Sequence, residues 1–205
     1  MVIADEIHAD LIMPGNVFQP YAALGDSFAN NTMVCSAPSK TFNLAGMHLS
    51  NMVIPNSEIK QAFDAYMQET GVAGGLNPFA LVAIEAAYRG GEDWLAQVLA
   101  YIHTNYLFLK HYLADHLPQL HLTELQGTYL AWIDFRELGL DQAALDQLTQ
   151  LDAKVLFDEG HVFGREGFGF ERINIACPRS VLALALYRLK IHINLLYVYL
   201  PCGSR

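Results

Sequence analysis

The chain has 205 residues, of which 53% are hydrophobic and 11% aromatic. This composition argues against disorder and supplies enough apolar side chains for one large domain or two small ones. Lys and Arg number 12 against 21 Asp and Glu, a net charge of −9. Because the chain is acidic and has no basic run, neither nucleic acid nor an anionic membrane surface is expected as a partner.

The cysteines and the N-terminus bear on cellular location. Three cysteines without metal-like spacing predict free, mostly buried thiols, as in a reducing cytoplasm; they are Cys35, Cys177 and Cys202. Asp5 and Glu6 stand where a secretory signal would need basic residues and then an apolar core. We therefore expect a cytoplasmic protein.

The closing stretch, residues 181–200, is the most membrane-like part of the sequence. Four polar side chains interrupt it near its middle, namely Arg188, Lys190, His192 and Asn194. Such groups are costly in lipid, so the stretch predicts a helix packed on a sheet and not a membrane span.

Two short apolar runs near the N-terminus each end in polar residues. Residues 2–4 precede Asp5 and His8, and residues 32–35 precede Ser36 and Lys40. Strands that deliver polar groups at their C-terminal ends predict an α/β sheet with a ligand at its carboxyl edge. Between them, residues 9–30 have loop chemistry, and a third strand is expected at 50–55.

Helical patterns fill the middle of the chain. Cap-like Asn56 and Asn77 precede predicted helices at about 57–69 and 79–88, and a longer helix is predicted over 92–117. A helix of that length is often a strut between two lobes. Its three histidines share no consistent metal-binding register, so no metal site is expected there; they are His103, His111 and His116.

After Pro118 the pattern changes to short strands that alternate with helices. Strands are predicted at 120–122, 128–134 and 170–177, and helices at 142–151 and after Pro178. A glycine-rich loop covers 160–169. This part predicts a small α+β lobe.

Lys40 follows an apolar run and stands between two hydroxyl residues, Ser39 and Thr41. Charge at a buried strand end is costly, which indicates a function. One hypothesis is that Lys40 carries a cofactor as a Schiff base, with Ser36 and Ser39 able to bind a phosphate. The alternative is a surface lysine in a loop, and the spacing alone does not separate the two.

Asp5 suits the ring nitrogen of a pyridine cofactor. A carboxylate beside that nitrogen raises its pKa and keeps the ring an electron sink. The alternative for Asp5 is a solvated loop or a helix cap. His8 could hydrogen-bond a ring hydroxyl, or be an ordinary packed histidine.

Arg172 interrupts an otherwise apolar strand pattern. An arginine there can hold a substrate carboxylate through two parallel hydrogen bonds, which lysine cannot do. The alternative is an ion pair with Glu171 or another acid.

Four motifs follow one another in the order and spacing of a known fold: Asp5-Glu6-Ile7-His8, Ala37-Pro38-Ser39-Lys40-Thr41-Phe42-Asn43, Gln126-Gly127-Thr128-Tyr129-Leu130-Ala131-Trp132 and Arg172-Ile173-Asn174-Ile175-Ala176-Cys177-Pro178-Arg179. Together they resemble the class I/II aminotransferase fold. Within it they resemble the pyridoxal-phosphate (PLP) C–S β-lyase branch, which includes the cystathionine β-lyase and cystalysin types. The resemblance implies an α/β, fold-type-I architecture with a partial large-domain sheet and a small α+β C-terminal domain.

The resemblance also implies roles in binding pyridoxal 5′-phosphate. Lys40 would bind the cofactor covalently, Asp5 would pair with the pyridinium nitrogen, and His8 would lie near the ring oxygen. Ser39, and less surely Ser36, would lie near the phosphate.

Arg172 would hold the α-carboxylate of an amino-acid substrate. The freed Lys40 would then remove the Cα proton as general base, and a thiolate would leave from Cβ. The expected products are a thiol, pyruvate and ammonia, formed from cystathionine or related cysteine conjugates.

The sequence resembles only the second half of a family member. The family's phosphate arginine after the lysine is absent, since that region reads Leu44-Ala45-Gly46-Met47-His48. Residues 1–90 would be the C-terminal part of the large PLP-binding domain, 91–118 an interdomain helix and 119–205 the small domain. Residues 197–205 do not resemble a family ending.

These features leave alternatives open. An aminotransferase would use the same Lys40, Asp5 and Arg172, although the lysine segment favours the lyase. A non-catalytic remnant, or a fragment that needs a complementary N-terminal half, is the third hypothesis. Family members are homodimers, so a homodimer is implied by the resemblance.

Overall fold

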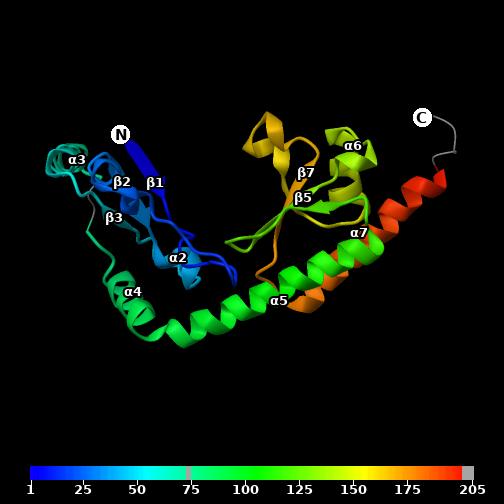
Figure 1. The fold of residues 1–205 in the computed structure, drawn as a ribbon, viewed down its shortest axis with the longest axis horizontal. Helices are drawn as coiled ribbons and strands as arrows, with labels where there is room; N and C mark the ends of the chain where they lie inside the picture. The colour runs from blue at the N-terminus through cyan, green and yellow to red at the C-terminus, as the bar shows by residue number, and fades with distance from the viewer. Residues whose placement is uncertain (73–74, 200–205) are drawn as a thin grey trace. The chain divides into compact units, whose positions relative to one another are not determined.

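The computed structural model describes residues 1–72 and 75–199 (Figure 1), so Cys202 and the end of the tail lie outside the described residues. The chain divides into two compact units. Unit 1 comprises Met1–Leu99 with Gln126–Thr128, and unit 2 comprises Ala100–Leu125 with Tyr129–Arg205. The boundaries expected at residues 90 and 118 stay predictions.

Unit 1 is built on a three-stranded sheet in the order β1–β2–β3. β1 (Val2–Asp5) is parallel to β2 (Thr32–Ser36), and β3 (Asn51–Val53) pairs antiparallel with the other side of β2. Parallel neighbours require a crossover connection. Here it carries two short helices, η1 (Tyr21–Leu24) and α1 (Asp26–Ala29). The crossover brings the C-terminal ends of β1 and β2 to the same edge.

Two capped helices follow the sheet. The Asn56 side chain accepts from the second and third N–H groups of α3 (Ser57–Thr70), and Gly71 ends the helix in a left-handed conformation at φ 66°. Asn77 caps α4 (Pro78–Gly90), whose first residue is proline. These caps satisfy N–H groups that have no partner inside the helix, so the predicted helix starts are confirmed.

The core of unit 1 is small. Its described residues include six buried apolar side chains, Leu11, Met13, Met33, Ala37, Pro38 and Ala80. All other buried apolar side chains among the described residues belong to unit 2. No described residue of α3 is buried, and α4 buries Ala80 alone.

Unit 2 contains a four-stranded antiparallel sheet in the order β4–β5–β7–β6. The strands are β4 (His121–Leu122), β5 (Leu130–Asp134), β7 (Phe170–Asn174) and β6 (Asp158–Glu159). Burial alternates along β5 and β7, as expected for a sheet with one face on a core. The strand pattern predicted over 170–177 ends at Asn174, whose side chain accepts from the Ala176 N–H and starts a turn.

Two long helices supply much of the unit 2 core: α5 (Glu92–His116), which begins in unit 1, and α7 (Arg179–Tyr199). Asn105 of α5 is fully buried and donates to the carbonyls of Ile175 and Cys177, just beyond β7. This amide fixes α5 against the segment that leads into α7.

The helix predicted at 142–151 is present in two forms. α6 (Gln142–Asp146) continues into a π-helical turn, η4 (Gln147–Asp152). The Thr149 hydroxyl donates to the Leu145 carbonyl at 3.0 Å, a local bond that competes with regular helix geometry.

Three short 3₁₀ turns complete unit 2, namely η3 (Arg136–Leu138), η5 (Gly160–Phe163) and η6 (Arg165–Gly167). Among the described helices, none is long and apolar enough to cross a membrane.

Candidate functional site

The carboxyl ends of β1 and β2 place polar residues side by side. Asp5 is the register partner of Cys35, and the Glu6 N–H donates to the Cys35 carbonyl at 2.8 Å. Ser36 is the last residue of β2. The predicted polar edge is therefore present in unit 1, where Asp5 ends one strand and Ser36 ends its parallel neighbour.

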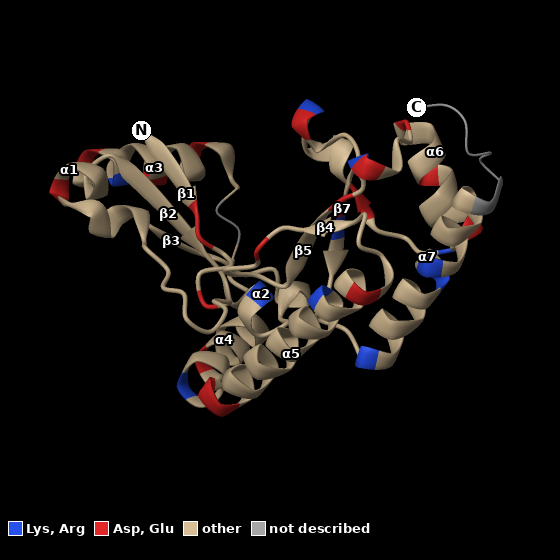
Figure 2. Ribbon diagram, turned by 45° about the vertical axis from the view of Figure 1, so that its right-hand side comes forward, with Lys and Arg blue, Asp and Glu red and all other residues tan. Residues whose placement is uncertain are grey.

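Lys40 follows this edge on a single helical turn, α2 (Pro38–Thr41). Ala37 is extended, Pro38 occupies the first turn, and the Phe42 N–H closes the turn on the Pro38 carbonyl at 2.8 Å. Lys40 is the one basic residue among the four residues of α2, and Figure 2, which colours Lys and Arg blue, shows a blue segment there. Its half-buried amine makes no hydrogen bond or ion pair within the described residues.

Two anchors hold the turn that carries Lys40. Thr41 is 2% exposed, and its hydroxyl donates to Asp10 Oδ2 at 2.9 Å. Phe42 packs edge-on against Tyr88 and lies near Trp94, with ring centroids 5.5 and 6.0 Å away. These contacts, which sequence patterns did not indicate, fix the turn directly after the lysine.

The other predicted cofactor residues lie on the same two strand ends. The exposed Asp5 accepts from the Ile7 N–H at 3.3 Å, whereas Glu6 is engaged by the Tyr21 N–H at 2.9 Å. His8 is half-buried in the turn after β1, where its carbonyl accepts from the Leu11 N–H. Asp5 is therefore the exposed acid at this strand end, and its role toward a cofactor stays a prediction.

The two serines of the predicted site occupy different elements. Ser36 closes β2 and Ser39 lies in α2, next to Lys40, and both are half-buried. The structure thus brings Asp5, His8, Ser36, Ser39 and Lys40 to one region of unit 1.

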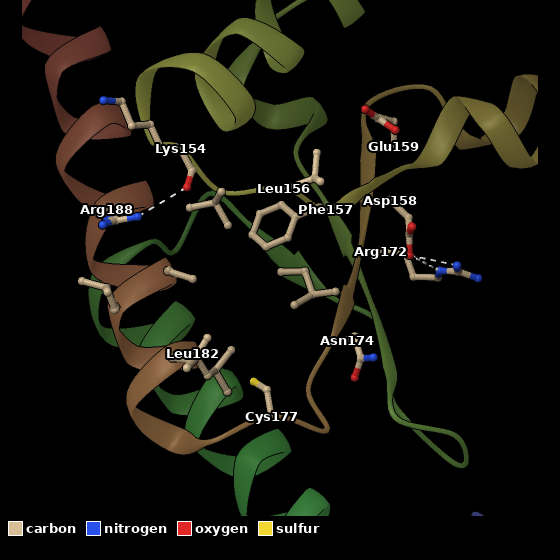
Figure 3. A pocket seen from close by; sticks show the side chains of 15 residues that line it. Lys154, Leu156, Phe157, Asp158, Glu159, Arg172, Asn174, Cys177, Leu182 and Arg188 are labelled. Atoms are coloured by element: carbon tan, nitrogen blue, oxygen red, sulfur yellow. Dashed lines mark hydrogen bonds and ion pairs between the residues drawn. The ribbon is translucent and has the colours of Figure 1, made fainter. Parts of the chain in front are cut away.

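Arg172 belongs to unit 2, in β7, opposite Trp132 of β5 and Asp158 of β6. Its Nε and Nη2 donate to Asp158 Oδ2 at 3.0 and 2.8 Å, and its guanidinium carbon lies 4.3 Å from the centroid of the Phe163 ring. Figure 3 shows the side chain directed away from α7. The ion pair is of the kind considered from the sequence, with Asp158 as the acid, and the substrate role of Arg172 stays a prediction.

A pocket of about 740 Å³ lies between α7 and the segment 154–159 with β7 (Figure 3). Its lining combines apolar side chains, such as Val155 and Leu182, with charged ones that include Arg172, and Cys177 lies at one end. Burial raises the pKa of the Cys177 thiol, which keeps this thiol protonated and unreactive. None of the predicted cofactor residues lines this pocket.

Glu171, beside Arg172 in sequence, points to the opposite face of the sheet and is 1% exposed. Neither of its carboxyl oxygens has a hydrogen-bond partner in the part of the chain that the structure describes. Burial, reinforced by the Glu159, Asp146 and Asp158 carboxylates, raises the pKa of Glu171 to about 8. It is therefore mostly protonated at neutral pH.

Comparison with known proteins identifies the family to which the chain belongs. The aminotransferase class I and II family matches residues 1–189. The chain belongs to this family. The strand-end aspartate and the lysine turn of unit 1 are thus parts of a class I and II fold.

Among curated members of the family, "Cystathionine beta-lyase PatB" of Bacillus subtilis is 40% identical over 189 residues. The match covers 92% of this chain and 49% of that protein. The chain therefore spans about half the length of the curated relatives it matches.

Solved class I and II structures agree with this likeness. Cystalysin from Treponema denticola, which contains a pyridoxal 5′-phosphate cofactor, has a TM-score of 0.90 and is 37% identical, with 96% of this chain and 50% of that chain covered. The PLP-bound C–S lyase from Staphylococcus hominis gives a TM-score of 0.85 at 30% identity, with 93% and 49% covered. The fold is that of fold-type-I PLP-dependent enzymes.

Proposed function

We propose that this chain forms part of a PLP-dependent carbon–sulfur β-lyase, which eliminates a thiol from cystathionine or a cysteine conjugate. The observation that carries the proposal is the position of Lys40, one turn beyond β2 and next to the strand that ends in Asp5. The β-lyase names of the relatives and structural neighbours support it.

The residues at this sheet edge fit the cofactor by their chemistry. A half-buried primary amine, an exposed carboxylate and two hydroxyls are the groups that an aldehyde, a pyridine nitrogen and a phosphate each require; they are Lys40, Asp5, Ser36 and Ser39. The neighbouring acids Glu6 and Asp10 are already engaged by Tyr21 and Thr41. Asp5 accepts from the Ile7 N–H of its own turn and is exposed at the end of β1, so we assign this carboxylate to the ring nitrogen.

Each predicted site residue then has a defined role in the reaction. Pyridoxal phosphate, when bound, supplies the electron sink for the carbanion at the substrate Cα. Lys40 accepts the Cα proton as general base, and Asp5 keeps the ring nitrogen protonated through its negative charge. Arg172 binds the substrate α-carboxylate, and His8 lies near the ring oxygen. The electron pair of the broken Cα–H bond forms a Cα=Cβ double bond, the C–S bond breaks with its electrons on the departing thiolate, and the proton stays on Lys40.

We also propose that unit 1 is completed by further polypeptide, either a second copy in a homodimer or a segment that supplies the other half of the family fold. Support comes from its small core and from large apolar side chains at the surface, such as Ile3 at 65%, Phe79 at 78% and Val82 at 69% exposed. Burying such surface stabilises association. A cytoplasmic location accords with the free thiols of Cys35 and Cys177.

Covalent trapping tests the assignment of Lys40. Purified chain is mixed with pyridoxal phosphate, reduced with borohydride and digested, and the modified peptides are identified by mass spectrometry. We expect modification at Lys40 that Lys40→Ala abolishes. Lys60→Ala is the matched control, because Lys60 is a half-exposed lysine paired with Asp64 in α3. Equal labelling of all lysines would contradict the proposal.

Once Lys40 has been trapped, the reaction class is tested. The chain is assayed together with the polypeptide proposed to complete unit 1. Pyruvate formed from cystathionine without a keto-acid acceptor supports the lyase. Product that forms only when a keto acid is added would instead establish an aminotransferase.

A further inference from the structure

Arg172 is held on two sides by neighbouring residues of unit 2. Asp158 Oδ2 accepts from both Nε and Nη2, and the Phe163 ring lies under the guanidinium at 4.3 Å. The Phe163 ring itself packs edge-on against Trp132, at a centroid distance of 5.8 Å. Trp132 is in turn the cross-strand partner of Arg172. The guanidinium therefore lies on a ring of the η5 turn that is itself packed against Trp132 of the same sheet as Arg172.

The contact with Asp158 leaves part of the guanidinium available. The planar group presents two edges with paired N–H donors, one formed by Nε and Nη2 and the other by Nη1 and Nη2. Asp158 occupies the first edge. The second edge can still take a carboxylate through two parallel hydrogen bonds, provided that the guanidinium plane is kept in place.

The backbone fixes the turn that carries Phe163. A Cβ on Gly160 would lie 2.2 Å from the Gly167 carbonyl oxygen, and one on Gly167 would lie 1.9 Å from that of Gly160. The two ends of the loop thus approach more closely than any other residue type allows, and Gly164 turns between them at φ 134°. The close contact between Gly160 and Gly167 joins the two ends of the loop and so fixes the backbone that carries Phe163.

We propose that Phe163 is a positioning residue for Arg172, supporting the guanidinium face while Asp158 holds its Nε–Nη2 edge, so that the Nη1–Nη2 edge receives the substrate carboxylate. This rests on the proposed function, in which Arg172 binds that carboxylate. Phe168 of the same loop is the control for the ring of Phe163, which is 52% exposed. Phe168 is also 52% exposed, but its ring contact is with His161 at 5.7 Å.

The test follows carboxylate binding by NMR on the ¹⁵N-labelled chain, with sodium acetate as the probe and sodium chloride as the ionic-strength control. The Arg172 Nε–H signal is identified as the one missing from Arg172→Lys. We expect Phe163→Leu to weaken acetate binding about threefold to fivefold, as loss of an exposed cation–π contact predicts. Phe163→Tyr, which keeps the ring, should stay within about twofold of wild type. Phe168→Leu should leave the affinity unchanged.

The outcomes separate the two proposals. Equal acetate affinity in Phe163→Leu and wild type would overturn the positioning role while leaving carboxylate binding by Arg172 intact. Equal losses in Phe163→Leu and Phe168→Leu would show a general effect of the loop and would also overturn it. An Arg172 signal that acetate does not move in wild type would instead contradict the role of Arg172 in the proposed function, and the positioning role with it.

Discussion

At the scale of single residues, the two basic groups of the proposed site are held in different ways. The Lys40 amine has no partner among the described residues, while its helical turn is anchored through Thr41 to Asp10. The Arg172 guanidinium instead has an acid on one edge and a ring beneath it. A reactive amine needs a fixed backbone and a free head group, whereas a carboxylate clamp needs a fixed plane.

Glu171 makes stability depend on pH. Its pKa is about 8 in the folded chain against 4.5 when exposed, so the folded state binds this proton more tightly. The associated stability is complete below about pH 4.5 and is lost as pH rises through about 8, at up to about 1.4 kcal/mol per unit. We expect Glu171→Gln to be increasingly more stable than wild type as pH rises across this window, measured by urea unfolding.

The control for Glu171 is Glu166→Gln, which alters an exposed acid in the neighbouring η6 turn. Its unfolding free energy should run parallel to that of wild type. A constant difference between Glu171→Gln and wild type from pH 4.5 to 8 would contradict a neutral buried acid.

At the scale of elements, the loop between β6 and β7 depends on two glycines. Gly167→Ala would push a Cβ into the Gly160 carbonyl, and relief of such a backbone clash costs about 1–3 kcal/mol. We expect faster hydrogen exchange in residues 158–172 and weaker protection of β7. Gly90→Ala is the control, since its Cβ meets nothing within 4 Å. Unchanged exchange in Gly167→Ala would count against a closed loop base.

Elements whose signals are local could be predicted from the sequence. The Asn56 and Asn77 caps, the strand ends at Asp5 and Ser36 and the long helix α5 all lie where their patterns indicate. The partners of the site side chains could not be predicted, because they join residues distant in sequence. Thr41 bonds Asp10 across 31 positions, and Arg172 bonds Asp158 across 14. No periodicity connects such pairs.

At the scale of the whole molecule, the two units differ in how much apolar surface they bury. Unit 2 holds nearly all of the core among the described residues, while β1 of unit 1 leaves Ile3 65% exposed on an edge strand. Unpaired edges and exposed apolar side chains favour association. The chain belongs to the class I and II family and spans about half the length of its relatives, so we expect further polypeptide to cover this apolar surface of unit 1.

We expect the isolated chain to self-associate, as measured by size-exclusion chromatography with light scattering. Ile3→Lys should reduce this association, because a charged side chain on an edge strand opposes pairing with another chain. Val162→Lys is the control, since Val162 is similarly exposed, at 61%, but lies in unit 2. A monodisperse wild-type monomer would contradict the expectation.

Helix α5 links this uneven burial to folding. Its described buried residues all lie between Ile102 and Leu113, in unit 2, and none lies in the stretch before Ala100. The costly nucleation of the helix is thus offset by the unit 2 core, and the first turns, where Trp94 lies near Phe42, extend it by propagation. Polypeptide that packs against residues 92–99 would therefore bind a helix that is already formed, without the conformational entropy cost of folding it.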